Sequence, residues 1–258
     1  MKILVTNDDG VLSEGLWILV RELIEIATVT VVAPDKEQSA IGTAVTLRRP
    51  VRMQKVNPVI PEVETYAVEG TPSDSVILAL GKLISGGVDL VISGINHGMN
   101  LGEDVHISGT VGAALQGYLR GFTSLAISAP FGNSEALDVA AKVAAILAGK
   151  ITGDSLPNGI FLNINLPDIP LVNISSVKIT RLSIGSHINT VEEGNDGNKE
   201  YYWLMRQRVK TVSGQETDIW AIDQGNISIT PLYLRRSGKP SLSILNNMCS
   251  DILQELRK

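Results

Sequence analysis

The feature that most constrains this chain is its first ten residues, MKILVTNDDG, which join an apolar run to a polar cluster. Ile3–Val5 is a continuous aliphatic run of the kind that forms a buried parallel strand, and Asn7–Gly10 follows it almost directly. In open α/β sheets, ligands bind at the carboxyl ends of the strands. Adjacent carboxylates such as Asp8 and Asp9 repel each other, and a divalent cation with oxygen ligands is the simplest counter-ion. From these residues alone, a metal site and a solvated Asp-Asp-Gly turn are equally good interpretations.

The segments that follow predict a sheet of parallel strands. Ser13–Ala27 places apolar residues at helical spacing, and Thr28–Val32 is a β-branched run. A strand, a helix and a second strand in such a short stretch form a βαβ unit. Further strands are expected at Asp89–Ile95, Ser124–Ala129 and Ile160–Leu166, an edge pair at Val51–Val56 and Glu64–Val68, and helices at Val76–Ile84, Val111–Gly121 and Ser134–Ala148. Ser73 and Ser134 are the expected N-caps of two of these helices.

A second polar stretch, Asn96–Thr110, has neither helical nor strand periodicity. Loops of this length in a compact domain are usually functional or disordered. Its end, Ser108–Thr110, opens a helix of small residues, where backbone amides and two hydroxyls can form an anion site suited to phosphate. N-capping by Ser108 or Thr110 is the alternative interpretation, and the two are compatible. Ser39 lies in another polar segment after a strand, and by itself it is interpreted as a loop or capping serine.

From Pro167 onward the texture of the sequence changes. Val177–Leu182, Tyr201–Val212 and Trp220–Thr230 are predicted to be β ribbons, because β-branched and aromatic runs alternate there with Gly, Asn and Asp. Leu242–Leu256 is predicted to be an amphipathic helix, which either docks on its own sheet or reaches a neighbouring subunit. We therefore divide the chain into a catalytic core, residues 1–166, and a β-ribbon and terminal-helix part concerned with oligomerisation, residues 167–258.

Composition and charge exclude several classes of protein. A net charge of −5 argues against binding to a nucleic acid polymer, whose affinity rests on neutralised phosphates. The single cysteine, Cys249, cannot form an internal disulfide, and no apolar run reaches the length of a membrane helix. The N-terminus lacks the shape of a signal peptide, because Asp8 and Asp9 interrupt any apolar region. A soluble cytoplasmic protein without a membrane partner is the expectation.

The residues support three hypotheses about function. The first is a metal-dependent phosphatase, in which Asp8, Asp9, Ser39 and Asn96 hold a cation and the helix start at 108–110 holds the phosphate. The second is a signalling receiver module, but Asn96 stands where its phosphate-accepting aspartate is required. The third is a haloacid-dehalogenase-like phosphatase, but Asn7 stands where its nucleophile is required. Dinucleotide-binding, Walker and nucleophile-elbow motifs are absent, and the histidines lack zinc spacing, which leaves His106 as a weak candidate for a general acid.

With these residues assembled, the chain resembles the SurE family, the survival-protein 5′/3′-nucleotidases. The matching segments lie in order along nearly the whole chain: Ile3–Gly10, Ala33–Gly42, Val68–Val76, Ser93–Val105, Ser108–Ala114 and Ile227–Leu232. One departure is Ile107, where the family pattern leads us to expect a tyrosine. This difference alters the wall of the expected pocket and none of its expected ligands.

The resemblance implies a Rossmann-like core and a C-terminal part that forms dimers or tetramers, often by exchange of the terminal helix. It implies a metal-dependent phosphatase that converts nucleoside monophosphates to nucleosides and phosphate, and some members also act on 3′-nucleotides or short polyphosphate. Carried over by position, the ligands of one Mg²⁺ or Mn²⁺ per subunit are Asp8, Asp9, Ser39 and Asn96. Asp8 and Asp9 are then the catalytic residues. The expected substrate-binding residues are Asn100, Ser108, Gly109 and Thr110. Which group delivers the attack on phosphorus stays open.

Overall fold

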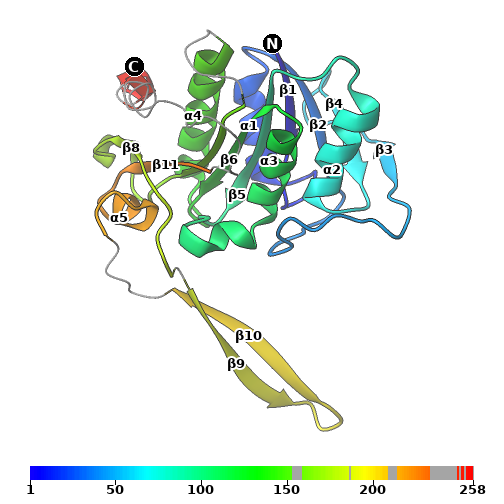
Figure 1. Cartoon of the computed structure of the whole chain (residues 1–258), viewed down its shortest axis with the longest axis vertical. Coiled ribbons are helices and arrows are strands. Elements are labelled where there is room, and N and C mark those ends of the chain that lie inside the picture. The colour runs from blue at the N-terminus through cyan, green and yellow to red at the C-terminus, as the bar shows by residue number, and fades with distance from the viewer. Residues whose placement is uncertain are drawn as a thin grey trace.

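The computed structural model describes residues 1–152, 159–185, 187–208, 214–232, 249, 251–252 and 254–257. Within these residues the strands form one nine-stranded sheet, in the order β3-β4-β2-β1-β5-β6-β7-β11-β8, and a separate two-stranded hairpin (Figure 1). The α/β fold predicted from the sequence is thereby confirmed. No helix in this described part is both long and apolar enough to cross a bilayer.

Six neighbouring strands of the large sheet are parallel. They are β4 (Glu64–Val68), β2 (Thr28–Pro34), β1 (Lys2–Thr6), β5 (Leu90–His97), β6 (Thr123–Ala129) and β7 (Phe161–Asn165). At one edge, β3 (Met53–Lys55) pairs antiparallel with β4, as expected for an edge pair. At the other edge, β11 (Ile227–Pro231) runs antiparallel to β7, and β8 (Val177–Ile179) runs parallel to β11. The sheet therefore continues beyond residue 166 into the C-terminal part of the chain.

Helices cover both faces of this sheet, as the resemblance implied. On one face, α1 (Glu14–Leu23) and α4 (Ser134–Thr152) pack beside each other, and Ile3 and Val5 of β1 belong to the core under them. On the other face lie α2 (Pro72–Leu78), which continues into a π-helical turn η1 (Ala79–Leu83), and α3 (Gly109–Leu119). Leu4 points to this second face, since successive strand residues alternate sides. Burial of β1 on both sides explains its unbroken apolar run.

Two predicted helix caps were wrong. The N-cap of α2 is Thr71, whose hydroxyl accepts a hydrogen bond from the amide of Asp74, while the Asp74 carboxylate accepts one from the amide of Thr71. This reciprocal pair is a capping box, and it uses two otherwise unpaired amides. At the start of α4, the side-chain oxygen of Asn133 accepts from the amide of Ala136 at 3.0 Å. Asn133 therefore does what we predicted for Ser134, just as Thr71 does what we predicted for Ser73.

The C-terminal part departs most from the sequence prediction. The predicted C-terminal β ribbon is present as a hairpin, in which β10 (Glu200–Arg208) pairs antiparallel with β9 (His187–Asn195). We did not predict the β9 segment itself, and the hairpin extends well away from the rest of the chain (Figure 1). The end of the predicted ribbon, residues 209–212, lies outside the described residues. Trp220 is not in a ribbon but in a short helix, α5 (Asp218–Asp223), which Thr217 caps with its hydroxyl.

The terminal segment contacts its own chain. The described residues Cys249, 251–252 and 254–256 are helical, and Ile252 and Leu256 belong to the main core. Lys150 of α4 forms ion pairs with Asp251 at 3.4 Å and Glu255 at 3.3 Å. The described part of the segment thus contacts α4 of its own chain, and the reach to a neighbouring subunit stays a prediction. The remainder of the predicted helix, 242–248, 250 and 253, lies outside the described residues.

Candidate metal and phosphate site

Three loops meet at the carboxyl edge of the sheet around Asp8 and Asp9. The amide of Gln38, in the loop after β2, donates to the backbone oxygen of Asp8 at 2.7 Å. The amide of His97, at the end of β5, donates to Asp9 Oδ2 at 3.3 Å. Gly10 has a φ of +98°, and a Cβ there would lie 3.2 Å from the Lys36 backbone. Only glycine fits this turn without strain, and it lets the chain leave the strand immediately after the aspartate pair.

Asp8 is a buried carboxylate packed against the start of α3. Its side chain accepts a short hydrogen bond from the Thr110 hydroxyl, and the residue is only 3% exposed. A Cβ on Gly109 would lie 2.8 Å from the Cβ of Asp8, so glycine allows the helix to approach this closely. Burial raises the pKa of Asp8 to about 6, and the charge of Asp9 adds to this, while the Thr110 hydrogen bond acts in the opposite direction.

Asp9 is less buried, but its surroundings also disfavour the charged form. Burial raises its pKa and the Glu37 carboxylate raises it further, while the His97 amide, the largest opposing influence, lowers it. Among the described residues, the ion pairs involve neither Asp8 nor Asp9. Two adjacent carboxylates therefore meet at the sheet edge without a lysine or arginine ion pair among the described residues, and the His97 ring charge lowers the pKa of Asp9.

Ser39 and Asn96, the other two expected ligands, lie next to residues that touch the aspartate pair. Ser39 follows Gln38, but its hydroxyl is exposed and donates to Glu37 Oε1 at 2.6 Å. Asn96 precedes His97, and its side-chain nitrogen donates to the Gly98 carbonyl at 2.6 Å, which fixes the amide and leaves its oxygen as an acceptor. Across the described part of the chain, no three His, Cys, Asp or Glu side chains are grouped to hold a metal. A cation here would take neutral oxygens and water as its further ligands.

The N-terminus of α3 has the organisation expected of both a capped helix and an anion site. The Ser108 hydroxyl accepts from the Val111 amide at 3.1 Å, which confirms Ser108 as the N-cap. The first intrahelical bond runs from the Gly112 amide to the Ser108 carbonyl at 3.0 Å. The amides of Gly109 and Thr110 precede that bond, so the helix itself cannot pair them. The Thr110 amide is directed at the Asp8 carboxylate, where its hydrogen bond lowers the pKa of Asp8, and both amides lie at the end of the helix dipole that attracts anions.

Asn100 anchors the long loop and uses its polar groups to do so. Its backbone amide donates to Asn165 Oδ1 at 2.7 Å, and its side-chain nitrogen donates to the Ser128 hydroxyl at 2.8 Å. Its carbonyl accepts from the side chains of Asn163 at 2.8 Å and Asn165 at 3.0 Å. Sequence reasoning missed both asparagines of β7. Their alternate spacing in IFLNINL was a readable signal, because residues two apart in a strand share one face.

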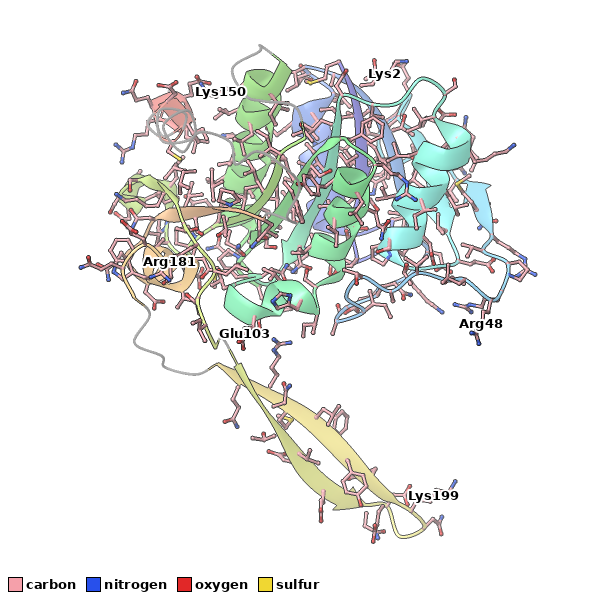
Figure 2. All side chains as sticks on the ribbon, viewed as in Figure 1. Lys2, Arg48, Glu103, Lys150, Arg181 and Lys199 are labelled. Carbon is pink, nitrogen blue, oxygen red and sulfur yellow. The ribbon has the colours of Figure 1, made fainter. Side chains whose placement is uncertain are left out.

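Two further carboxylates tie the C-terminal part to this loop. Asp218 of α5 is fully buried and accepts from the amides of Gly102 at 2.7 Å and Ser183 at 2.9 Å. Asp104 accepts a hydrogen bond and ion pair from Arg206 of β10. Asp104 belongs to η2 (Gly102–His106), a 3-10 turn just before α3, and Asp218 holds the first residue of that turn. Figure 2 shows Glu103 of the same turn facing the base of the hairpin. Hairpin and phosphate-side helix are therefore connected through one short turn.

The histidines of the loop face different surroundings. His97 packs its ring against Phe131, with centroids 6.2 Å apart and planes at 70°. His106, the weak candidate for a general acid, lines a cavity of about 1490 Å³ whose walls also come from Thr43, β8, α5 and Cys249. Neither Asp8 nor Asp9 lines this cavity. This cavity is thus separate from the aspartate pair.

Comparison with known proteins places this geometry in a family. The profile described as Survival protein SurE matches residues 3–189. A Dehalococcoides mccartyi protein named 5′-nucleotidase SurE is 53% identical over 259 residues, covering 100% of this chain and 98% of that protein. A Legionella pneumophila protein of the same name is 38% identical over 256 residues, covering 99% of this chain and 100% of its own.

A solved structure gives the same result at the level of the fold. The crystal structure of SurE protein from Aquifex aeolicus superposes with a TM-score of 0.77 at 33% identity, covering 96% of this chain and 98% of that one. The family match extends over most of the chain, and the relatives match it end to end. This chain belongs to the SurE family.

Proposed function

We propose that this protein is a metal-dependent 5′-nucleotidase, which hydrolyses nucleoside monophosphates to nucleosides and phosphate. The observation that carries the proposal is the placement of Asp8. It is a buried carboxylate beside a second carboxylate, it has no cationic partner among the described residues, and it accepts from a hydroxyl at the start of α3. The names of the Dehalococcoides and Legionella relatives support the same activity.

The donor set fits a hard divalent cation. Two ionised carboxylates, a serine hydroxyl and an asparagine oxygen are ligands that Mg²⁺ and Mn²⁺ accept, with waters and substrate oxygens completing the shell. A bound cation would also remove the cause of the raised pKa values, because it would compensate the charge that burial disfavours. Asp8, Asp9, Ser39 and Asn96 would hold one such ion per subunit. When bound, the ion supplies Lewis-acid polarisation of the phosphoryl oxygens.

The residues of the chain then have separate tasks. The Gly109 amide at the N-terminus of α3 binds and orients the phosphate, while the Thr110 amide supports the Asp8 carboxylate. The Thr110 hydroxyl holds the Asp8 carboxylate and so fixes the distance between that helix and the cation ligands. Asn100 keeps the intervening loop against the ends of β6 and β7. A phosphate bound between the proposed cation ligands and the helix start would contact both, and hydrolysis of the ester needs both.

The finer expectations belong to the same proposal. Action on 3′-nucleotides and short polyphosphate follows if the site recognises mainly the phosphate and the cation. A homodimer or homotetramer fits the apolar side chains on the hairpin, which are described below. A cytoplasmic location fits the lone buried cysteine.

The test is phosphate release from AMP, GMP and their 3′ isomers, first with a chelator and then with added Mg²⁺ or Mn²⁺. We expect release only with added metal, and faster release from the 5′ isomers. Equal rates with the chelator present would overturn the metal dependence. Absence of release from every nucleotide, by protein shown to be folded, would overturn the reaction class.

A further inference from the structure

Exposed apolar side chains surround the polar centre at the carboxyl edge. Leu12 follows the aspartate turn, Ile41 lies in the loop after β2, Ile107 precedes α3 and Phe131 lies in the turn between β6 and α4. The largest and most exposed of them is Phe131, at 83%. Ligand sites commonly combine such apolar surface with a few convergent polar groups. These residues could therefore contact an apolar part of a ligand whose polar part lies at the aspartate pair.

The turn that carries the Phe131 ring is fixed on both sides. On one side, the Gly98 amide donates to the carbonyl of Ala129, the last residue of β6, at 2.8 Å. On the other, Asn133 caps α4 and donates its side-chain nitrogen to Asp168 at 2.8 Å. The ring is therefore exposed on a held turn, which lowers the entropy that a ligand must overcome on binding it.

A short chain of contacts connects this ring to the proposed cation ligands. The ring of His97 meets that of Phe131 edge to face, and the backbone amide of the same histidine donates to Asp9. His97 is half-buried, while Phe131 beside it is largely exposed. The exposed Phe131 ring is thus braced edge to face by a histidine whose backbone amide binds Asp9.

We propose that Phe131, supported by His97, is the stacking surface for the nucleobase of the substrate. The inference rests on the proposed nucleotidase function and deepens it, because it names the part of the substrate that is recognised away from the phosphate. A nucleobase is a planar aromatic group, and stacking on an aromatic side chain tolerates any base. The surface would favour nucleotides over phosphate esters that lack a base, and it would discriminate little between purines of similar size.

The first test compares two substrates that differ only in the base, AMP and ribose 5-phosphate. In Phe131→Ala we expect the KM for AMP to rise about tenfold and the KM for ribose 5-phosphate to stay within about twofold. Phe131→Tyr should restore the AMP value, while Phe131→Leu should restore only part of it, because it keeps apolar surface but loses the ring. Ile26→Ala, an exposed apolar change at the opposite, amino edge of the sheet, is the control and should alter neither KM.

The outcomes separate the inference from the proposed function. Equal changes for the two substrates, or none, would overturn the stacking surface while leaving the nucleotidase in place. A smaller particle in light scattering of Phe131→Ala, with AMP kinetics unchanged per subunit, would also overturn it and assign the ring to a second copy of the chain. If the wild type releases no phosphate, the nucleotidase fails. Saturation-transfer NMR of adenosine in chelator then still decides the surface, because we expect the adenosine signal to be lost in Phe131→Ala and kept in Phe131→Tyr.

Discussion

The carboxyl edge of the parallel core buries a charged group, whereas the β9–β10 hairpin exposes apolar ones. At the sheet edge a charge lies inside the protein, since Asp8 is 3% exposed and lacks a cationic partner within the described residues. On the hairpin, large apolar side chains lie in water, among them Tyr202, Trp203 and Leu204. Charged groups are rarely buried alone, and contiguous apolar patches are rarely left exposed.

The difference indicates what each region lacks. The electrostatic cost of two adjacent carboxylates at a partly buried site is lowered by a small, highly charged ligand, which needs few contacts at short range. An exposed two-stranded ribbon is only marginally stable by itself, and it is stabilised by packing against another surface of comparable area. We therefore propose chemistry for the first region and self-association for the second. Metal binding and assembly should then respond to different mutations.

The largest effect should come from Asp8→Asn. The amide keeps the size and the acceptor for Thr110 but removes the charge that would hold the cation, so metal-stimulated phosphate release from AMP should fall on the order of a thousandfold. The matched control is Asp138→Asn on the exposed face of α4, which should leave turnover unchanged. Full activity of Asp8→Asn would contradict the assignment of the site.

The same buried charge predicts how the metal-free protein responds to pH. The folded pKa of Asp8 is about 6 and its ordinary value is 3.8, so the folded chain holds a proton in this window that the unfolded chain has lost. The free energy of unfolding should therefore fall as pH rises from about 4 to above 6, by up to about 3 kcal/mol. Urea unfolding in chelator at pH 5 and pH 7.5 measures this, and Asp8→Asn should lose most of the difference.

Protons should also compete with the cation. Below pH 6 the Mn²⁺ affinity, measured by calorimetry, should decrease about tenfold per pH unit, because the ion must displace the proton on Asp8. An affinity that is unchanged between pH 5 and pH 7.5 would show that Asp8 does not contact the ion.

Loss of the ion pair between Arg206 of the hairpin and Asp104 of the core should have a smaller effect. Removing the ion pair with Arg206→Met should lower the free energy of unfolding by about 1 kcal/mol and raise the KM for AMP a few-fold, because Asp104 belongs to the turn before α3. A double-mutant cycle with Asp104→Asn isolates the pair. Arg52→Met, which breaks the more exposed pair with Glu69, is the control and should change neither quantity measurably.

The smallest catalytic effect should come from the hairpin. Trp203→Ser combined with Leu204→Ser removes exposed apolar area, so light scattering should show a smaller particle than the wild type. Turnover per subunit should stay within about twofold, since the aspartate pair lies in the core. A variant whose particle mass in solution equals that of the wild type would contradict the role of the hairpin in assembly. A variant that loses metal binding would contradict the separation of the two regions.

The parallel core was predictable because its strands are buried on both faces, which leaves an unbroken apolar run such as Ile3–Val5. The location of the polar residues at the ends of β1 and β5 and at the start of α3 was predictable for a related reason, since the carboxyl ends of parallel strands meet at one edge of the sheet. The ligand role proposed for Ser39 rests on the resemblance alone, because nothing local distinguishes it from a loop serine. The capping box of Thr71 and Asp74 was readable, and choosing Ser73 overlooked it.

The C-terminal part was harder to predict because its elements are short or exposed. α5 has six residues, too few to show helical periodicity, so Trp220 was assigned to a strand. β9 is mostly polar and exposed, so no alternation of burial marks it. The pairing of Arg206 with Asp104 joins residues 102 positions apart, and no local pattern encodes it.

The most direct test of the central claim is Mn²⁺ binding by calorimetry at pH 7.5, with the wild type, Asp8→Asn and Asp9→Asn measured side by side. We expect one ion per subunit in the wild type and a loss of at least about a hundredfold in affinity in each variant, with Asp138→Asn binding as the wild type does. Unchanged binding in both aspartate variants would show that the buried pair is not a metal site, and the proposed function would have to be abandoned.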